Sequence, residues 1–164
     1  MKNILIVTGG SGFVGSNLID CLIKKTNFQI ISFDDYSSGS KKNHLKNKRV
    51  KYIKGHTKDI SKIFKNKEKK IHSLFHFGEF SRIYQSFKLI DQCYYSNMIG
   101  TYEVIKFCSK HNIKIIYSAS SSKFGNKGKD ENLSPYSWSK SKNIEFIENT
   151  NKTGKNKEVE VLET

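Results

Sequence analysis

The feature that most constrains this sequence is its opening segment from Ile4 to Gly15, ILIVTGGSGFVG. Four apolar residues predict a short buried strand, the glycines predict a turn, and the following residues to about Lys25 have the spacing of an amphipathic helix. Glycines at positions 9, 12 and 15 let the backbone approach a pyrophosphate and let the helix pack closely on its strand. The helix N-terminus offers unpaired N–H groups to phosphates. The segment therefore predicts a phosphate-binding turn.

An acidic residue stands at a second informative position. The apolar segment 29–33 ends in Asp34 and Asp35. A carboxylate placed there can accept hydrogen bonds from both hydroxyls of an adenosine ribose and would repel a 2′-phosphate, so we expect NAD rather than NADP. The alternative is an ordinary strand–turn–helix unit with a solvated aspartate, and the combined context favours the cofactor site.

Apolar segments alternate with helical patterns along the chain. Strands are expected at 3–8, 29–33, 50–54, 71–77 and 113–118, with another at 158–162, and helices at 12–25, 58–66, 86–110 and 136–150. This alternation predicts an α/β fold, a doubly wound parallel sheet in the order 3-2-1-4-5 with helices on both faces. Ligands of such sheets collect at the carboxyl ends of the strands, where loops 37–48 and 125–134 are expected.

Composition limits the function classes. The length of 164 residues suits one compact domain. The net charge of +14 could indicate nucleic acid, but Arg49 and Arg82 are the only arginines, and the lysines spread over nearly every segment. Specific phosphate recognition usually uses arginine, so we expect no specific nucleic-acid partner. Three scattered cysteines fit a reducing cytoplasm and no metal site, and no apolar segment approaches membrane-spanning length.

Several residues after the middle strands are candidates for contact with the cofactor. His56 and Thr57 follow the third strand, a position near the adenine in such a sheet. The fourth strand ends in His76–Glu79, where a small residue would let the cofactor lie close. We interpret His76 as a core histidine bonded by backbone, and Glu79 as a solvated loop carboxylate. Asn97, amid large apolar neighbours, needs partners and is predicted to bridge two strand ends.

A tyrosine and a lysine four residues apart, Tyr136 and Lys140, begin the last predicted helix and share one of its faces. A nearby ammonium favours a phenolate, which makes Tyr136 a candidate general base. A serine hydroxyl at the end of the fifth strand could bond the reacting alcohol or carbonyl. The pair alone is a weak signal, but its place after a fifth parallel strand makes it a strong one.

Taken together, these motifs resemble the extended short-chain dehydrogenases/reductases, the NAD-dependent nucleotide-sugar epimerases and dehydratases. The matching segments are Thr8–Gly15, Asp34–Gly39, His76–Gly78, Asn97–Thr101, Tyr117–Gly125 and Ser134–Lys140. The resemblance implies a Rossmann-like fold and a catalytic trio of Ser120, Tyr136 and Lys140. It implies cofactor contacts from Gly9, Gly12, Phe13, Val14, Gly15, Asp34, Asp35, Ser38, His56, Thr57, Phe77, Gly78, Asn97, Ser118, Tyr136 and Lys140.

The implied reaction is a transient oxidation of a nucleotide sugar to a keto-sugar. Tyr136 would take the hydroxyl proton, Ser120 would steady that oxygen, and Lys140 would hold the nicotinamide ribose. The resemblance further implies a homodimer through helices 86–110 and 136–150. The alternatives are an inactive NAD-binding or partner-binding module and a carbonyl reductase that consumes NADH.

The sequence departs from the family pattern in three places. His56 stands where the family usually has an aspartate that accepts from the adenine amino group, and only a neutral imidazole could accept that bond. The loop 125–134 is short and polar. The chain also ends at Thr164, so we expect an incomplete NAD-binding domain over 1–164 without a substrate domain, either truncated or completed by a separate chain.

Overall fold

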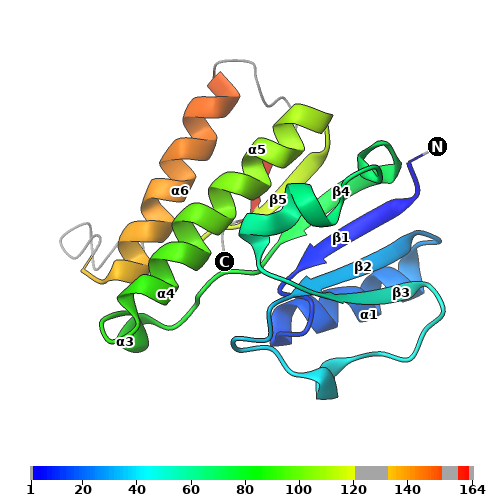
Figure 1. Ribbon diagram of the computed structural model, residues 1–164, viewed down its shortest axis with the longest axis horizontal. Coiled ribbons are helices and arrows are strands. Elements are labelled where there is room, and N and C mark those ends of the chain that lie inside the picture. Colours follow the sequence, from blue (N-terminus) through cyan, green and yellow to red (C-terminus); the bar gives the residue numbers. More distant parts are fainter. Residues whose placement is uncertain (1, 121–132, 153–158, 163–164) are drawn as a thin grey trace.

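The computed structural model describes residues 2–120, 133–152 and 159–162, and six parallel strands form its centre (Figure 1). The strands are β1 (Ile4–Thr8), β2 (Gln29–Asp34), β3 (Val50–Lys54), β4 (Ile71–His76), β5 (Lys114–Ser118) and β6 (Val159–Leu162). They lie side by side in the order β3-β2-β1-β4-β5-β6. This is the predicted Rossmann-like order, with the sixth strand added beyond β5.

Helices cover both faces of the sheet, as predicted. On one face α1 (Phe13–Lys25) packs through Ile19 against Val7 and Ile30. On the other face α2 (Ile60–Ile63), α5 (Thr101–His111) and α6 (Pro135–Lys152) share a larger core with the inward side chains of the strands. The central strands β1 and β2 are buried almost throughout, which fits the largely apolar sequence of β1 and the apolar residues Ile30, Ile31 and Phe33 of β2.

The helix predicted at 86–110 is interrupted. A single turn, α3 (Ile83–Ser86), precedes α4 (Ile90–Tyr94), and a π-helical segment, Tyr95–Gly100, then joins α4 to α5. The close approach of this segment to the third strand's loop accounts for its glycine, because a Cβ at Gly100 would lie 2.2 Å from the Thr57 hydroxyl oxygen. The single helix predicted over 86–110 is therefore wrong in its first turns and in its uniform geometry.

The helix predicted at 58–66 is also shorter than expected. It consists of a 3-10 turn, η2 (Thr57–Asp59), followed by the single turn of α2, and the chain leaves the helix at Phe64. Further 3-10 turns are η1 (Lys41–Asn43) and η3 (Glu68–Lys70). Most of the predicted loop 125–134 lies outside the described residues. Within the part that the structure describes, no helix has the length and apolar character needed to cross a membrane.

The start of α6 is set by local chemistry. Ser134 caps the helix, because its hydroxyl oxygen accepts a hydrogen bond from the Ser137 N–H at 3.0 Å. Pro135 follows at the first helical position, where its fixed φ suits a helix and its missing N–H costs nothing. These two residues begin α6 where Tyr136 reaches the cleft at the carboxyl edge of the sheet.

Candidate functional site

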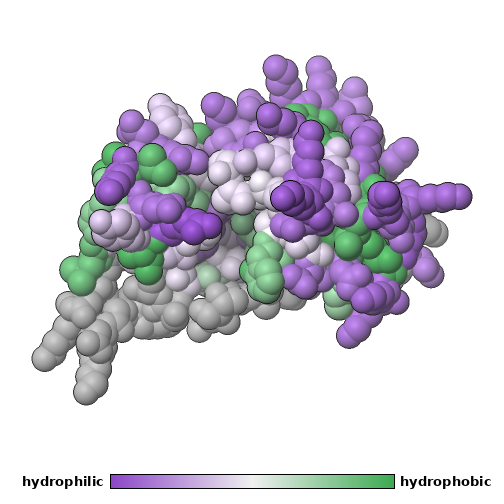
Figure 2. Space-filling model, turned by 90° about the horizontal axis from the view of Figure 1, so that it is seen from below, coloured by the Kyte–Doolittle hydropathy of each residue, from purple (hydrophilic) through white to green (hydrophobic). Residues whose placement is uncertain are grey.

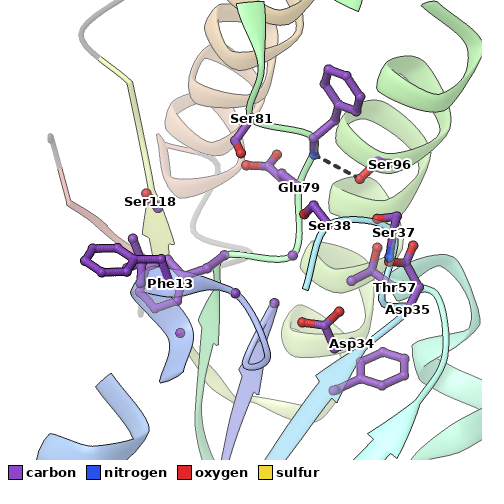
Figure 3. Close-up of a pocket in the computed structure, with 18 of the residues that line it drawn as sticks. Phe13, Asp34, Asp35, Ser37, Ser38, Thr57, Glu79, Ser81, Ser96 and Ser118 are labelled. Atoms are coloured by element: carbon purple, nitrogen blue, oxygen red, sulfur yellow. Dashed lines mark hydrogen bonds between the residues drawn. The ribbon is translucent and has the colours of Figure 1, made fainter. Parts of the chain in front are cut away.

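A cleft of about 550 Å³ opens at the carboxyl ends of the parallel strands. Figure 3 shows Asp34, Asp35, Ser37 and Thr57 at one end and Phe13 and Ser118 at the other. Its lining includes most of the predicted site: Gly9, Gly12, Phe13, Val14, Gly15, Asp34, Asp35, Ser38, Thr57, Phe77, Gly78, Ser118, Tyr136 and Lys140. The sequence motifs, which extend from Gly9 to Lys140 along the chain, therefore converge on one cavity.

The glycine turn at one wall of the cleft requires its glycines. Gly9 has φ +67°, and a Cβ there would lie 2.6 Å from the Phe77 carbonyl oxygen. A Cβ at Gly15 would lie 2.3 Å from the Gly9 carbonyl oxygen, so the first turn of α1 sits directly against the strand end. The turn thus leaves the N-terminus of α1 bare at the cleft, with Phe13 82% exposed beside it. This arrangement suits a phosphate group.

Asp34 ties the glycine turn to the end of β2. One carboxylate oxygen accepts from the Ser11 N–H at 2.9 Å and the other from the Tyr36 N–H at 2.8 Å. Each oxygen has two lone pairs, so the carboxylate can still accept from ligand hydroxyls in the cleft that it lines. The loop after β2 closes over the same turn, because Asn43 donates its side-chain N–H to the Ser11 carbonyl at 2.8 Å.

His56 and Thr57 have different roles. Thr57 lines the cleft, whereas His56 is absent from its lining and caps η2. The Nδ1 atom of His56 accepts from the Lys58 N–H at 3.1 Å, which requires an unprotonated nitrogen. Burial lowers the pKa of His56 below its ordinary value, so the imidazole is neutral near pH 7. His56 therefore caps η2 in the way that an aspartate side chain would. Its contact with adenine stays a prediction.

Asn97 is buried, and its side chain forms hydrogen bonds with two separate segments of the chain. Its side-chain oxygen accepts from the Phe80 N–H at 2.7 Å, and its nitrogen donates to the Phe80 carbonyl at 3.0 Å and to the Ser139 hydroxyl at 2.9 Å. It therefore joins the segment after β4 to α6, and the predicted bridge between two strand ends is wrong. Neither Asn97 nor Ser120 is part of the cleft lining, and Ser120 follows the lining residue Ala119. Their predicted contacts with cofactor or substrate stay predictions.

Lys140 is held deep in the cleft by an ion pair with Glu79. Their side chains are 4% and 5% exposed, respectively. The ammonium also donates to the Ser118 carbonyl oxygen and lies 4.3 Å from the centre of the Tyr117 ring. Burial works to raise the pKa of Glu79, but the Lys140 ammonium and hydrogen bonds outweigh it and hold that pKa below its usual value. The interpretation of Glu79 as a solvated carboxylate is therefore wrong.

A chain of hydrogen bonds runs from this ion pair to the glycine turn. Thr101 donates its hydroxyl to Glu79 Oε1 at 2.7 Å, so its oxygen must accept from His76 Nε2 at 2.9 Å. His76 Nδ1 then accepts from the Thr8 hydroxyl at 2.7 Å, and Thr8 accepts from the Gly78 N–H at 2.9 Å. Side-chain hydroxyls therefore satisfy His76, where backbone partners were expected.

The sequence interpretation missed several lining residues: Phe33, Ser37, Asn43, Gly55, Glu79, Phe80, Ser81, Arg82, Ser96 and Ala119. Ser37 stands inside the motif 34–39, and Ser81 and Arg82 follow the fourth strand, so position at a strand end was an available signal. Glu79 carried a subtler signal, because its carboxylate interrupts an otherwise uncharged segment between Phe77-Gly78 and Phe80. Asn43 and Ser96 carried no such signal. Among the described residues, no cluster of side chains could hold a metal ion.

Parallel strands wound in this order, with a glycine turn at the head of α1, define a Rossmann-like domain. Residues 5–160 match the model of the NAD dependent epimerase/dehydratase family, and the chain belongs to that family.

Curated relatives lie within the same family. The chain is 30% identical over 129 residues to a dTDP-D-glucose 4,6-dehydratase of Dictyostelium discoideum, covering 74% of this chain and 30% of that protein. It is 28% identical over 157 residues to a putative UDP-glucose 4-epimerase of Methanocaldococcus jannaschii, covering 88% and 50%. The chain thus spans half or less of the length of these two relatives.

Solved structures match over almost the whole chain. A dTDP-glucose 4,6-dehydratase from Streptomyces venezuelae with NAD bound has a TM-score of 0.88 at 18% identity, over 98% of this chain and 55% of that one. A UDP-glucose 4-epimerase from Brucella ovis in complex with NAD has a TM-score of 0.85 at 19% identity, over 98% and 51%. At these identities the likeness establishes the fold.

Proposed function

We propose that this chain binds NAD in the cleft and forms the cofactor-binding and catalytic portion of a nucleotide-sugar epimerase or dehydratase. The observation that carries the proposal is the convergence of two distant groups on one cavity. Asp34 and the glycine turn line one part of it, and Tyr136 and Lys140 of α6 line another. A dinucleotide needs both a grip for its ribose and phosphates and a reacting end beside a proton acceptor.

The residues present fit the cofactor. The positive φ of Gly9 and the close approach at Gly15 leave a backbone cradle that any Cβ would fill. The bare N-terminus of α1 would hold the pyrophosphate, and Asp34 would accept from the adenosine ribose. Ser118, Tyr136 and Lys140 would lie at the nicotinamide end.

In the proposed reaction the chain's own side chains manage the sugar hydroxyl. Tyr136 takes its proton, Ser120 donates a hydrogen bond to the same oxygen, and Lys140 holds the nicotinamide ribose and stabilises the phenolate. NAD, when bound, supplies the reversible acceptance of a hydride from the sugar carbon. Because the hydride is returned in the same catalytic cycle, no net consumption of the cofactor is expected.

Calorimetric titration with NAD and NADP tests the cofactor half of the proposal. We expect NAD to bind more tightly than NADP, and Asp34→Ala to weaken NAD binding by roughly tenfold, from the loss of charge-assisted hydrogen bonds to the ribose. Asp20→Ala is the matched control, because Asp20 pairs with Lys24 on the surface of α1. Equal NAD affinity in the wild-type and Asp34→Ala chains would contradict the proposal.

Turnover tests the catalytic half. The chain is incubated with NAD and a panel of nucleotide sugars, and products are separated by chromatography. We expect Tyr136→Phe to abolish product formation while NAD affinity stays within about twofold, since the phenol is proposed to act in proton transfer. NAD binding without any product in the wild type would favour the alternative of an inactive module. Net oxidation of NADH would favour a carbonyl reductase.

A homodimer is the proposed assembly. Large apolar side chains are exposed on the elements predicted to pair: Tyr94, Tyr95, Tyr102, Trp138 and Phe146. Ile83, Tyr84 and Phe87 add further apolar surface on and just after α3, and Figure 2 shows hydrophobic surface at the end of the molecule that α3 occupies. Contiguous exposed apolar surface is typical of an interaction site.

A cytoplasmic location stays a prediction from the scattered cysteines.

A further inference from the structure

The ammonium of Lys140 occupies a position that few lysines tolerate. Its side chain is 4% exposed, and a lysine removed from water favours the neutral amine unless a negative charge lies against it. Among the described residues, the ion pair of Lys140 is with Glu79. The Ser118 carbonyl and the Tyr117 ring add partial negative charge, but neither carries a full one.

The other titratable groups around the pair come from four elements. His76 on β4 is neutral near pH 7, because burial lowers its pKa to about 4. Burial raises the pKa of Tyr117 on β5 and that of Cys93 on α4, which keeps both groups uncharged. Tyr136 on α6 lines the same cleft. Within the described ranges, the Glu79 carboxylate is the negatively charged group that pairs with Lys140.

The Glu79 carboxylate is itself fixed in place. Its Oε1 atom accepts from the Thr101 hydroxyl at 2.7 Å, the Tyr117 hydroxyl at 3.0 Å and the Asn143 amide at 3.0 Å. These donors come from α5, β5 and α6, so three elements hold Oε1 and leave Oε2 for the ammonium. A carboxylate held by several donors is stabilised in its charged form.

We propose that Glu79 is the positioning residue of Lys140, seating its amine at the carboxyl end of β5 and keeping it charged inside the cleft. The inference deepens the proposed function and rests on it, since Lys140 there holds the cofactor and supports Tyr136. A glutamine at position 79 would retain the side-chain volume and an oxygen for the three donors. Its NH₂ group would face the ammonium as a second donor, and the negative charge that pairs with the buried amine would be lost, which disfavours the charged form.

Nitrogen NMR of ¹⁵N-lysine-labelled chain, without cofactor, tests this inference. The Lys140 Nζ signal is assigned by its loss in Lys140→Met. At pH 7 we expect an ammonium signal for Lys140 in the wild type and a neutral-amine shift in Glu79→Gln. The matched control is Glu103→Gln, because Glu103 pairs with Lys106 on the surface, and there Lys106 should remain an ammonium. A Lys140 ammonium signal that persists unchanged in Glu79→Gln would overturn the inference.

A second measurement uses the wild type alone and covers the case in which Glu79→Gln fails to fold. Hydrogen exchange of the Lys140 ammonium should be on the order of tenfold or more slower than that of Lys24, whose ion pair is exposed. Exchange of Lys140 as fast as that of Lys24 would contradict a seated ammonium. Both measurements are made without NAD, so their outcomes are independent of cofactor binding. If the chain failed to bind NAD, only the proposed function would be overturned. If the charge of Lys140 did not depend on Glu79, only this inference would be overturned.

Discussion

Substitution of Gly9 by alanine should damage the fold as well as the cofactor site. Gly9 has φ +67°, and its Cβ would lie 2.6 Å from the Phe77 carbonyl oxygen and 2.7 Å from the carbonyl carbon. The left-handed conformation costs an alanine about 1–2 kcal/mol. Overpacking against backbone adds about 1–3 kcal/mol, since backbone cannot rotate aside. The free energy of unfolding should therefore fall by about 2–5 kcal/mol in Gly9→Ala.

Gly12→Ala is the matched control in the same turn. Its nearest neighbour would be the Gly9 carbonyl oxygen at 3.2 Å, and its φ of −81° suits alanine. We expect a loss of about 1 kcal/mol or less for this variant, the size of an N-cap effect. Urea unfolding followed by circular dichroism gives both values. If Gly9→Ala is no less stable than Gly12→Ala, the structural reasoning about the turn is refuted.

Three further predictions concern pH, a half-buried arginine and assembly. Burial lowers the pKa of His76 from 6.5 to about 4. Between these two pH values, His76 therefore binds a proton in the unfolded chain but not in the native chain. The stability that the neutral His76 side chain contributes is complete above pH 6.5 and is lost as the pH falls towards 4. The free energy of unfolding should therefore drop by about 2 kcal/mol between pH 7 and pH 5. The drop should be smaller in His76→Gln. Arg49→Lys should lower the free energy of unfolding, measured in urea, by about 1–2 kcal/mol, because Arg49 donates to the Thr26 and Ile23 carbonyls. As a control, Arg82→Lys on the surface should change that free energy by less than about 0.5 kcal/mol. Sedimentation equilibrium should show a dimer that Tyr95→Lys weakens, whereas a monomeric wild type would contradict the proposed assembly.

Much of the fold could be predicted because its signals are local. Apolar runs bounded by glycine or charge placed every strand within two residues, and the glycine turn fixed the start of α1. The helices after β3 and β4 were less predictable. Their surroundings include tertiary contacts such as the close approach of Gly100, the last residue of the π-helical segment, to Thr57. Periodicity reports which face of a helix is apolar, and it carries no information on where a neighbouring loop interrupts that helix.

The site was predictable where chemistry requires a residue type and unpredictable where burial decides. Glycines in the turn before α1 and a carboxylate at the end of β2 are residue types that a dinucleotide site would require. The buried carboxylate of Glu79 depends on donors from α5, β5 and α6, which lie between 22 and 64 positions away in the chain. No local pattern reveals such partners. His56 was singled out by its position, yet its cap on Lys58 became visible only with the backbone in place.

The central claim is that one dinucleotide spans the cleft, with its adenosine at Asp34 and its reacting ring at Tyr136. Intermolecular nuclear Overhauser effects in a complex of the labelled chain with NAD test it most directly. We predict contacts from the adenine protons to the side chain of Thr57 and from the nicotinamide protons to the ring of Tyr136. Contacts in the reverse order, or a saturated complex in which neither residue lies near the cofactor, would contradict the account.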